Sequence, residues 1–176
     1  MEHKDFYSSR LKMLLIKKGY AAQAHLVLQD EALYRYIPKS APSLADLERT
    51  FGFWENRDSP DKSEYWLNWI VCTQDTGACI GRVQIGIHKE KKVGDIAYMI
   101  GSASQGKGYG TEAVRALLNH CQEVYGVSCF KAWIDTRNAA SIRLVEKVGM
   151  HEIEFIEKAD HFDGEDSDEY VYQLMV

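Results

Sequence analysis

The chain has 176 residues, a length that suits one domain with a substantial hydrophobic core. Hydrophobic residues make up 45% and charged residues 27%, which is the ordinary balance of a soluble globular protein. The formal net charge of −5 argues against nucleic acid as the main partner, because phosphate binding needs a basic face, and is compatible with a cationic substrate.

Targeting signals and metal-binding patterns are not expected in this chain. The N-terminal apolar stretch, residues 13–16, lies between lysines and is too short for a signal-peptide core or a membrane span. The four cysteines and six histidines have no spacing typical of a metal site. We therefore expect a cytoplasmic protein with reduced cysteines, no metal and no membrane partner.

In the first half of the chain, the hydrophobic pattern predicts helical segments followed by a run of strands. Ser43 precedes an apolar repeat of three or four residues, as an N-cap does, and Pro38 ends the helical turn before it. Three later strands are joined by turns so short that they must be antiparallel neighbours. The expected elements are a strand over 11–16, helical segments over 21–28, 30–36 and 43–54, a loop over 56–62, and strands over 65–72, 79–88 and 93–100.

The second half of the chain predicts a strand–loop–helix–strand unit, which needs parallel strands and a crossover helix. Gly149 follows a later helical stretch, at the position where glycine ends a helix. The expected elements are a helix with apolar positions Val114, Leu117, Leu118, Cys121 and Val124, a strand over 130–134, a helix over 138–148, and strands over 153–158 and 170–175 around an acidic loop. The fold class is therefore a mixed α/β (α+β) sheet, mostly antiparallel.

The segment at the start of this unit, residues 105–110 (Gln-Gly-Lys-Gly-Tyr-Gly), has three glycines at alternate positions before a predicted helix. Glycine lacks a Cβ, so its backbone can curl tightly and approach a ligand. The unpaired N–H groups and the positive end of the helix dipole would then point into the curl. The pattern predicts a binding loop for a phosphate or pyrophosphate.

The segment partly matches three known phosphate-binding motifs. A P-loop fits the stretch 101–107, but Gly108 stands where the magnesium-binding hydroxyl should be. A dinucleotide fingerprint that begins at Gly106 fails at Thr111, although Asp135 mimics its ribose-binding acid. The third pattern, [RQ]-x-x-G-x-[GA], is the acetyl-CoA loop of the GNAT N-acetyltransferases, and Gln105, Gly108 and Gly110 fill its positions.

Four ordered blocks of the sequence resemble that family. They are residues 95–100, 105–113, 138–141 and 146–150. The resemblance is closest to the Rim-type (RimJ/RimL-like) branch, which acetylates N-termini of ribosomal proteins. Beyond the four blocks, it also includes Arg10, at the start of the first strand, and the closing strand. It implies a single GNAT acetyltransferase domain over residues 1–176, with a mostly antiparallel central sheet, one splayed pair of parallel strands and flanking helices.

The resemblance also implies how acetyl-CoA, a co-substrate, would bind. The acetyl-pantetheine arm would enter the gap between the splayed strands, bond to main chain at Met99 and Ile100, and contact Asn138, whose alternative role is a helix cap. Lys107 either adds a positive charge at the phosphates or is a solvated loop lysine. The pyrophosphate would lie on the N–H groups from Gly106 to Gly110. The cofactor-binding residues expected in the loop and the first helical turn are Gln105, Gly106, Lys107, Gly108, Tyr109, Gly110 and Thr111.

For catalysis, the resemblance implies direct attack of a primary amine on the thioester in a ternary complex. Val145 stands where many relatives carry a tyrosine acid, so Ser141 is the candidate acid, with a capping serine as the alternative. Asp95 is the candidate base, and a strand-end carboxylate with only local bonds is its alternative. The general interpretations left open are a non-catalytic acyl-CoA-binding module and a nucleotide-binding protein.

The acceptor is less determined than the acetyl donor. It is expected to be a small molecule or a protein N-terminus, and the protein a monomer or homodimer. An acidic segment, Asp160 to Glu169, would either attract a cationic acceptor or be a solvated loop.

Overall fold

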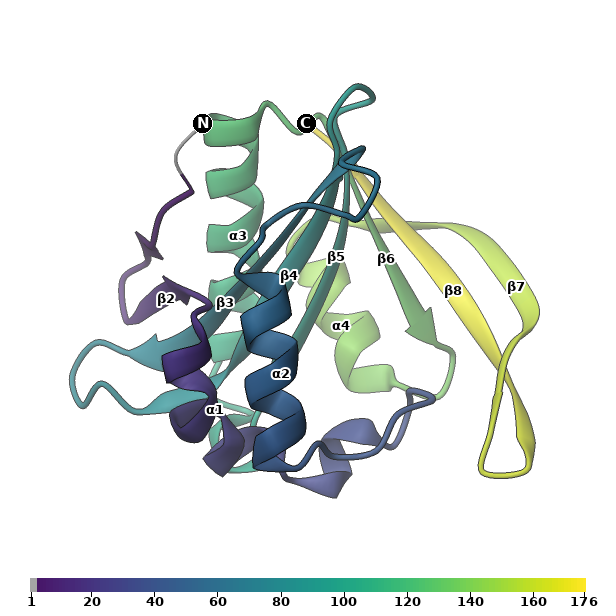
Figure 1. The fold of residues 1–176 in the computed structure, drawn as a ribbon. Helices are drawn as coiled ribbons and strands as arrows, with labels where there is room; N and C mark the ends of the chain where they lie inside the picture. The colour runs from purple at the N-terminus through teal and green to yellow at the C-terminus, as the bar shows by residue number, and fades with distance from the viewer. Residues whose placement is uncertain (1–2) are drawn as a thin grey trace.

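The computed structural model describes residues 3–176, in which one eight-stranded sheet carries helices on both faces (Figure 1). The strands are β1 (Phe6–Tyr7), β2 (Leu11–Leu15), β3 (Glu64–Thr73), β4 (Cys79–His88), β5 (Val93–Ile100), β6 (Cys129–Asp135), β7 (His151–Phe162) and β8 (Glu165–Met175). The helices are α1 (Ala21–Leu28), α2 (Leu44–Trp54), α3 (Tyr109–Tyr125) and α4 (Ala139–Lys147), with 3₁₀ turns η1 (Lys18–Tyr20), η2 (Glu31–Tyr34) and η3 (Ser102–Ser104). The mixed α/β (α+β) fold expected from the sequence is confirmed.

Strands β1 to β5 follow one another across the sheet in chain order, and every neighbouring pair is antiparallel. Short turns impose the antiparallel pairing of β3, β4 and β5, and the turn between β3 and β4 contains Gly77 in the left-handed region, with φ of 73°. The predicted meander is therefore confirmed. Strands β2 and β3 are instead joined by the long connection that carries α1 and α2. Among the strands in the described part of the chain, the two-residue edge strand β1 alone had no counterpart in the expected elements, because two residues are too few to show a period.

The parallel pair β5 and β6 is joined at one end only. Three residue pairs form its ladder, and the last of them is Asp95 with Lys131. Beyond that pair, within the described chain, residues 96–100 of β5 face no ladder partner in β6, whose other edge pairs with β8 along its whole length. The two strands thus open into a gap toward their carboxyl ends, as the resemblance implied.

Two hydrophobic clusters hold the helices against opposite faces of the sheet. Consecutive residues of β3 alternate between them: Trp69 belongs to the cluster under α3 and α4, and Ile70 to the cluster under α1 and α2. The apolar stripe predicted for α3 is buried in the first cluster, except that Val124 is 39% exposed and Tyr125 takes the last core position. The predicted stripe therefore ended one residue early, at Val124 instead of Tyr125.

Local signals at helix ends behave as predicted. The Ser43 side chain accepts a hydrogen bond from the Asp46 N–H at 3.2 Å and caps α2. Gly149 follows α4 with φ of 98°, a conformation that favours glycine. The helical segment expected over 30–36 is shorter, because only the 3₁₀ turn η2 forms after the Asp30 cap.

The acidic segment is not the expected loop. Strands β7 and β8 form one long hairpin that extends beyond the rest of the molecule (Figure 1), and its turn is the left-handed pair Asp163 and Gly164, with φ of 54° and 79°. The expected strand bounds were too short because β7 is an edge strand that is exposed on both faces, so it shows no alternation of polar and apolar residues.

Candidate active site

The glycine loop at residues 105–110 begins the candidate site. Gly106 and Gly108 adopt left-handed φ values of 74° and 80°, and Gly108 is the N-cap of α3. Within the described chain, the six backbone N–H groups from Gly106 to Thr111 donate to no protein acceptor. A row of unpaired donors at the start of a helix fits a pyrophosphate, so this part of the site is able to hold the acetyl-CoA phosphates.

Neighbouring elements hold the glycine loop in place. A Cβ on Gly110 would lie 2.8 Å from Leu144 Cδ1, so the glycine lets the first turn of α3 approach α4 closely. The Gln105 side-chain amide donates to the Ile100 carbonyl at 2.9 Å and ties the loop to the end of β5. Lys107 is exposed, and its ammonium donates to the Ala103 carbonyl at 2.9 Å, so it already has a partner within the loop.

The main chain of β5 presents alternate residues to the gap. Gly101 donates to the Ile80 carbonyl in β4 at 2.9 Å, and N–H and C=O groups alternate sides along an antiparallel strand. Ile100 therefore turns its main chain to the gap, whereas Met99 turns its main chain to β4 and packs its side chain with the cluster under α1 and α2. Of the two residues expected to bond a pantetheine arm, this geometry favours Ile100, chiefly through its N–H, because the Ile100 carbonyl already accepts from Gln105.

Ser141 lies in the first turn of α4 and shares a hydrogen bond with a tyrosine that the sequence did not single out. The Tyr98 hydroxyl, from β5, is 2.6 Å from Ser141 Oγ and also donates to the Ser141 carbonyl at 3.2 Å. Burial raises the pKa of Tyr98 to about 12, so the phenol stays protonated at neutral pH. The block at residues 95–100 contained Tyr98, but no sequence pattern indicated its partner.

Asn138 caps α4 beside this pair. Its side-chain oxygen accepts a hydrogen bond from the Ser141 N–H at 3.1 Å, which confirms the capping role. Within the described residues, the Asn138 amide nitrogen donates to no protein acceptor and remains available to a ligand. The cap and the tyrosine together fix Ser141 from two sides.

Asp95 lies where β5 and β6 stop pairing, at the closed end of the gap. The residue is exposed, yet the protein partly screens its carboxylate from water; this burial and the nearby negative charge of Glu64 raise the pKa of Asp95, while Lys131 lowers it. Side chains alternate along a strand, so Asp95 and Tyr98 lie on opposite faces of the sheet. The structure does not bring Asp95 and Ser141 into contact.

A second feature that sequence reasoning missed braces the glycine loop. The Arg10 side chain donates to Glu112 Oε2 at 2.7 Å and to the Lys107 carbonyl at 3.2 Å, and its guanidinium lies 4.5 Å from the centre of the Tyr109 ring. Partial burial favours a higher pKa for Glu112, but hydrogen bonds from Arg10 and Ser8 outweigh it and hold the pKa below its ordinary value. A groove of about 740 Å³ beside this brace carries further basic side chains, Arg115 and Lys147.

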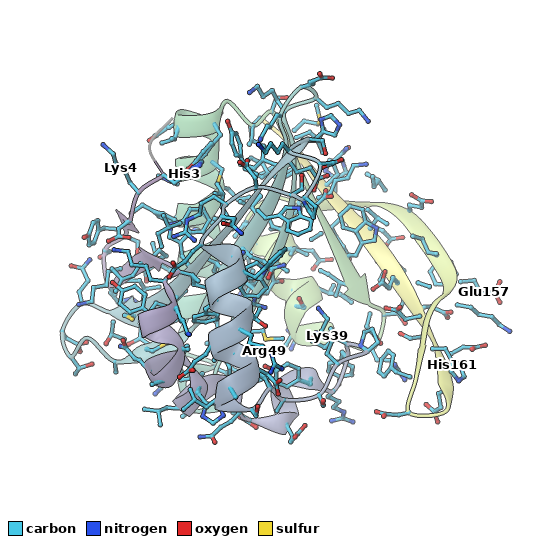
Figure 2. The ribbon with its side chains drawn as sticks, viewed as in Figure 1. His3, Lys4, Lys39, Arg49, Glu157 and His161 are labelled. Carbon is cyan, nitrogen blue, oxygen red and sulfur yellow. The ribbon has the colours of Figure 1, made fainter. Side chains whose placement is uncertain are left out.

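On the opposite side of the site, the segment after η2 faces the β7–β8 hairpin. A pocket of about 350 Å³ lies between them, lined by Tyr34, Lys39 and Phe162 among others. Figure 2 shows Lys39 between α2 and the hairpin that carries His161. Two acidic groups of the hairpin have basic partners on the protein surface, which favours the solvated interpretation of this segment. The pairs are Arg137 with Glu165, Lys158 with Asp166 and His161 with Asp166.

Among residues 3–176, no cluster of three or more histidine, cysteine or acidic side chains could hold a metal ion. In the same part of the chain, no helix is long and apolar enough to cross a membrane. The four cysteines are free thiols.

Comparisons with known proteins agree with this geometry. A family model described as an acetyltransferase (GNAT) domain matches residues 10–151 of the chain. The uncharacterised protein YkkB of Bacillus subtilis (strain 168) is 34% identical over 110 residues, which cover 60% of this chain and 63% of YkkB, less than two thirds of that relative.

Two solved structures have the same fold at low sequence identity. RimL, a ribosomal L7/L12 alpha-N-protein acetyltransferase in complex with coenzyme A, gives a TM-score of 0.86 at 17% identity over 96% of both chains. Spermidine N-acetyltransferase from Vibrio cholerae, in complex with CoA and spermine, gives a TM-score of 0.82 at 16% identity over 95% of this chain and 96% of that chain. Because the family model spans both the splayed strands and the glycine loop, the chain belongs to the GNAT acetyltransferase family.

Proposed function

We propose that this protein transfers an acetyl group from acetyl-CoA to a primary amine. One observation carries the proposal: six unpaired N–H groups, from Gly106 to Thr111, lie beside the open gap between β5 and β6. RimL and the spermidine N-acetyltransferase, whose structures contain CoA, share this fold. The remaining predictions from sequence, a Rim-type relationship, a cytoplasmic location, and a monomer or homodimer, stay part of this proposal.

When bound, acetyl-CoA supplies an activated acetyl thioester. In the transfer, a C–N bond forms and a C–S bond breaks, the attacking ammonium gives up two protons in all, and the departing thiolate takes one. The residues of the chain must therefore accept a proton on one side of the gap and donate one on the other. Each such positioned group contributes about 10²–10⁴-fold to the rate.

The proton donor of this proposal is the hydroxyl of Ser141. The hydrogen bond to Tyr98, at 2.6 Å, and the Asn138 cap fix its position at the gap. The Tyr98 phenol stays protonated, and its single hydroxyl proton can turn from the Ser141 carbonyl to Ser141 Oγ. In that arrangement the serine proton is left for the thiolate. This pair would take the place of the tyrosine that Val145 replaces.

The proton acceptor of this proposal is Asp95. A carboxylate with a raised pKa is a better base at neutral pH than an ordinary aspartate. Asp95 and Tyr98 lie on opposite faces of the sheet, so the amine would approach from the face covered by α1 and α2 and the thiolate would meet Ser141 on the other. The acceptor on this account is a small molecule or a protein N-terminus with an accessible amine.

The first experiment is thermal unfolding of the protein with acetyl-CoA, free CoA or magnesium–ATP. A ligand at a hundred times its dissociation constant adds about 2.7 kcal/mol to the free energy of unfolding. We expect stabilisation by acetyl-CoA and CoA and none by ATP; stabilisation by ATP alone would refute the proposal and favour the nucleotide-binding interpretation. Thiol release with a panel of amines then separates an enzyme from a non-catalytic acyl-CoA-binding module, the alternative that Val145 favours.

A further inference from the structure

Arg82 is a cation without a counter-ion on the face of the sheet that α1 and α2 cover. Its guanidinium donates one long hydrogen bond, 3.3 Å, to Asn68 Oδ1 and lies 4.8 Å from the centre of the Trp54 ring. Within the described chain, no carboxylate forms an ion pair with it. Four of the five N–H donors of a guanidinium thus have no acceptor in the protein.

Arg82 is partly buried, and its unpaired nitrogens are not sealed from solvent, so an external ligand can reach them. A partly desolvated charge without a partner is costly, and another arginine in the same protein shows the usual remedy. Arg57, also partly buried, donates to the carbonyls of Trp54 and Ile16 at 2.7 and 2.6 Å. Arg82 has no such carbonyls, and burial lowers its pKa to about 10. Acidic residues are common in this chain, which has 26 of them, yet none of those described forms an ion pair with Arg82. The free donors point to an anion that comes from outside the chain.

The position of Arg82 relates it to the acceptor side of the gap. Arg82 is paired in register with Met99, and two residues along β4 Gln84 is paired with Ala97, in the part of β5 that opens away from β6. Two residues of a strand span about 7 Å. Alternation places Arg82 and Asp95 on the same face of the sheet, and Ala97 lies between their levels along β5. The Arg82 guanidinium contacts Asn68 of the neighbouring strand β3, so an acceptor bound on this face would lie between Arg82 and Asp95.

We propose that Arg82 binds a carboxylate of the amine acceptor, and that the acceptor is therefore an amino acid and not a simple amine or a polyamine. The inference rests on the proposed acetyltransferase function and specifies its substrate class. A planar guanidinium pairs with the two oxygens of a carboxylate through parallel N–H bonds. The side chains that contact Arg82, Asn68 and Trp54, bring no second cation of the kind that a phosphate dianion would need.

The test measures acetyl transfer by thiol release with the twenty amino acids and, for each, the amide of its α-carboxyl group, which lacks the α-carboxylate charge. The amide keeps the size of the acceptor and removes only that charge. We expect the wild-type protein to have at least one amino acid whose kcat/KM exceeds that of its amide by about 10- to 100-fold, the range for one charge-assisted hydrogen-bonded contact. In Arg82→Gln this ratio should fall to about 1, mainly through KM, while the amide is acetylated as before.

A matched control and a binding measurement keep the test independent of folding. Arg57→Gln removes a buried guanidinium that carbonyls satisfy, and it should leave the ratio unchanged. Calorimetric titration of the wild-type protein, in the presence of CoA, with the preferred amino acid and its amide should show the same preference. Equal kcat/KM for every amino acid and its amide, or an equal preference in Arg82→Gln, would overturn the inference while transfer to amines still supports the function. No transfer to any amine, with no stabilisation by acetyl-CoA, would instead refute the function itself.

Discussion

The hydrogen bond between Tyr98 and Ser141 predicts that the two hydroxyls act as one unit. Tyr98→Phe removes a single oxygen and leaves the ring in its place between β5 and α4. Ser141 Oγ then loses its partner at 2.6 Å, although the Asn138 cap still holds the backbone of the serine. The change therefore isolates the positioning of the serine hydroxyl from the position of the helix.

The expected sizes follow from these contacts. Loss of one partly buried hydrogen bond lowers the free energy of unfolding by about 0.5–1.5 kcal/mol, too little to unfold a typical domain. Ser141→Ala removes the proposed donor and should lower kcat by about 10²-fold or more. Tyr98→Phe leaves the donor but no longer fixes it, and a cost of about 1.4 kcal/mol in the transition state corresponds to a tenfold lower kcat.

The assay is thiol release from acetyl-CoA at saturating amine, with the dissociation constant of acetyl-CoA measured by calorimetry on the same samples. If Tyr98 acts through Ser141, adding Tyr98→Phe to Ser141→Ala will lower kcat no further. All three variants should bind acetyl-CoA as tightly as the wild type. Independent effects that multiply in the double variant, or an unchanged kcat in Tyr98→Phe, would refute the coupling.

Three further predictions test other parts of the site. Asp95 has a raised pKa and must be deprotonated to accept a proton, so kcat/KM should fall as the pH drops through that pKa. Asp95→Asn should flatten this acid limb of the pH profile. An unaltered profile in the variant would exclude Asp95 as the base. Asn138→Ala should weaken acetyl-CoA binding by about 1–3 kcal/mol in calorimetry, beyond the loss of the helix cap, and unchanged affinity would reduce the residue to a cap. Gly110→Ala forces a Cβ against Leu144 and should lower the free energy of unfolding by about 1–3 kcal/mol in urea titration. In the control Gly52→Ala, in α2, nothing crowds the new Cβ, and the free energy of unfolding should rise by about 0.5–1 kcal/mol. Equal effects of the two substitutions would contradict the packing argument.

The sequence by itself determined the features that depend on neighbouring residues. Each of these features depends on residues that are close together in the sequence. They are the cap at Ser43, the end of α4 at Gly149, the apolar stripe of α3 and the short turns of the meander. The glycine loop is equally local, because left-handed φ values and a helix start are properties of consecutive positions. The family blocks placed these features in the correct order along the chain.

Only the tertiary structure decided which distant side chains meet. Tyr98 and Ser141 are 43 residues apart, and Arg10 and Glu112 are 102 apart, so no periodicity connects them. The long β7–β8 hairpin was missed because a strand exposed on both faces has no hydrophobic alternation to detect. The unpaired guanidinium of Arg82 is the extreme case, since a missing partner is a property of everything packed around a residue and cannot be read from its own position in the sequence.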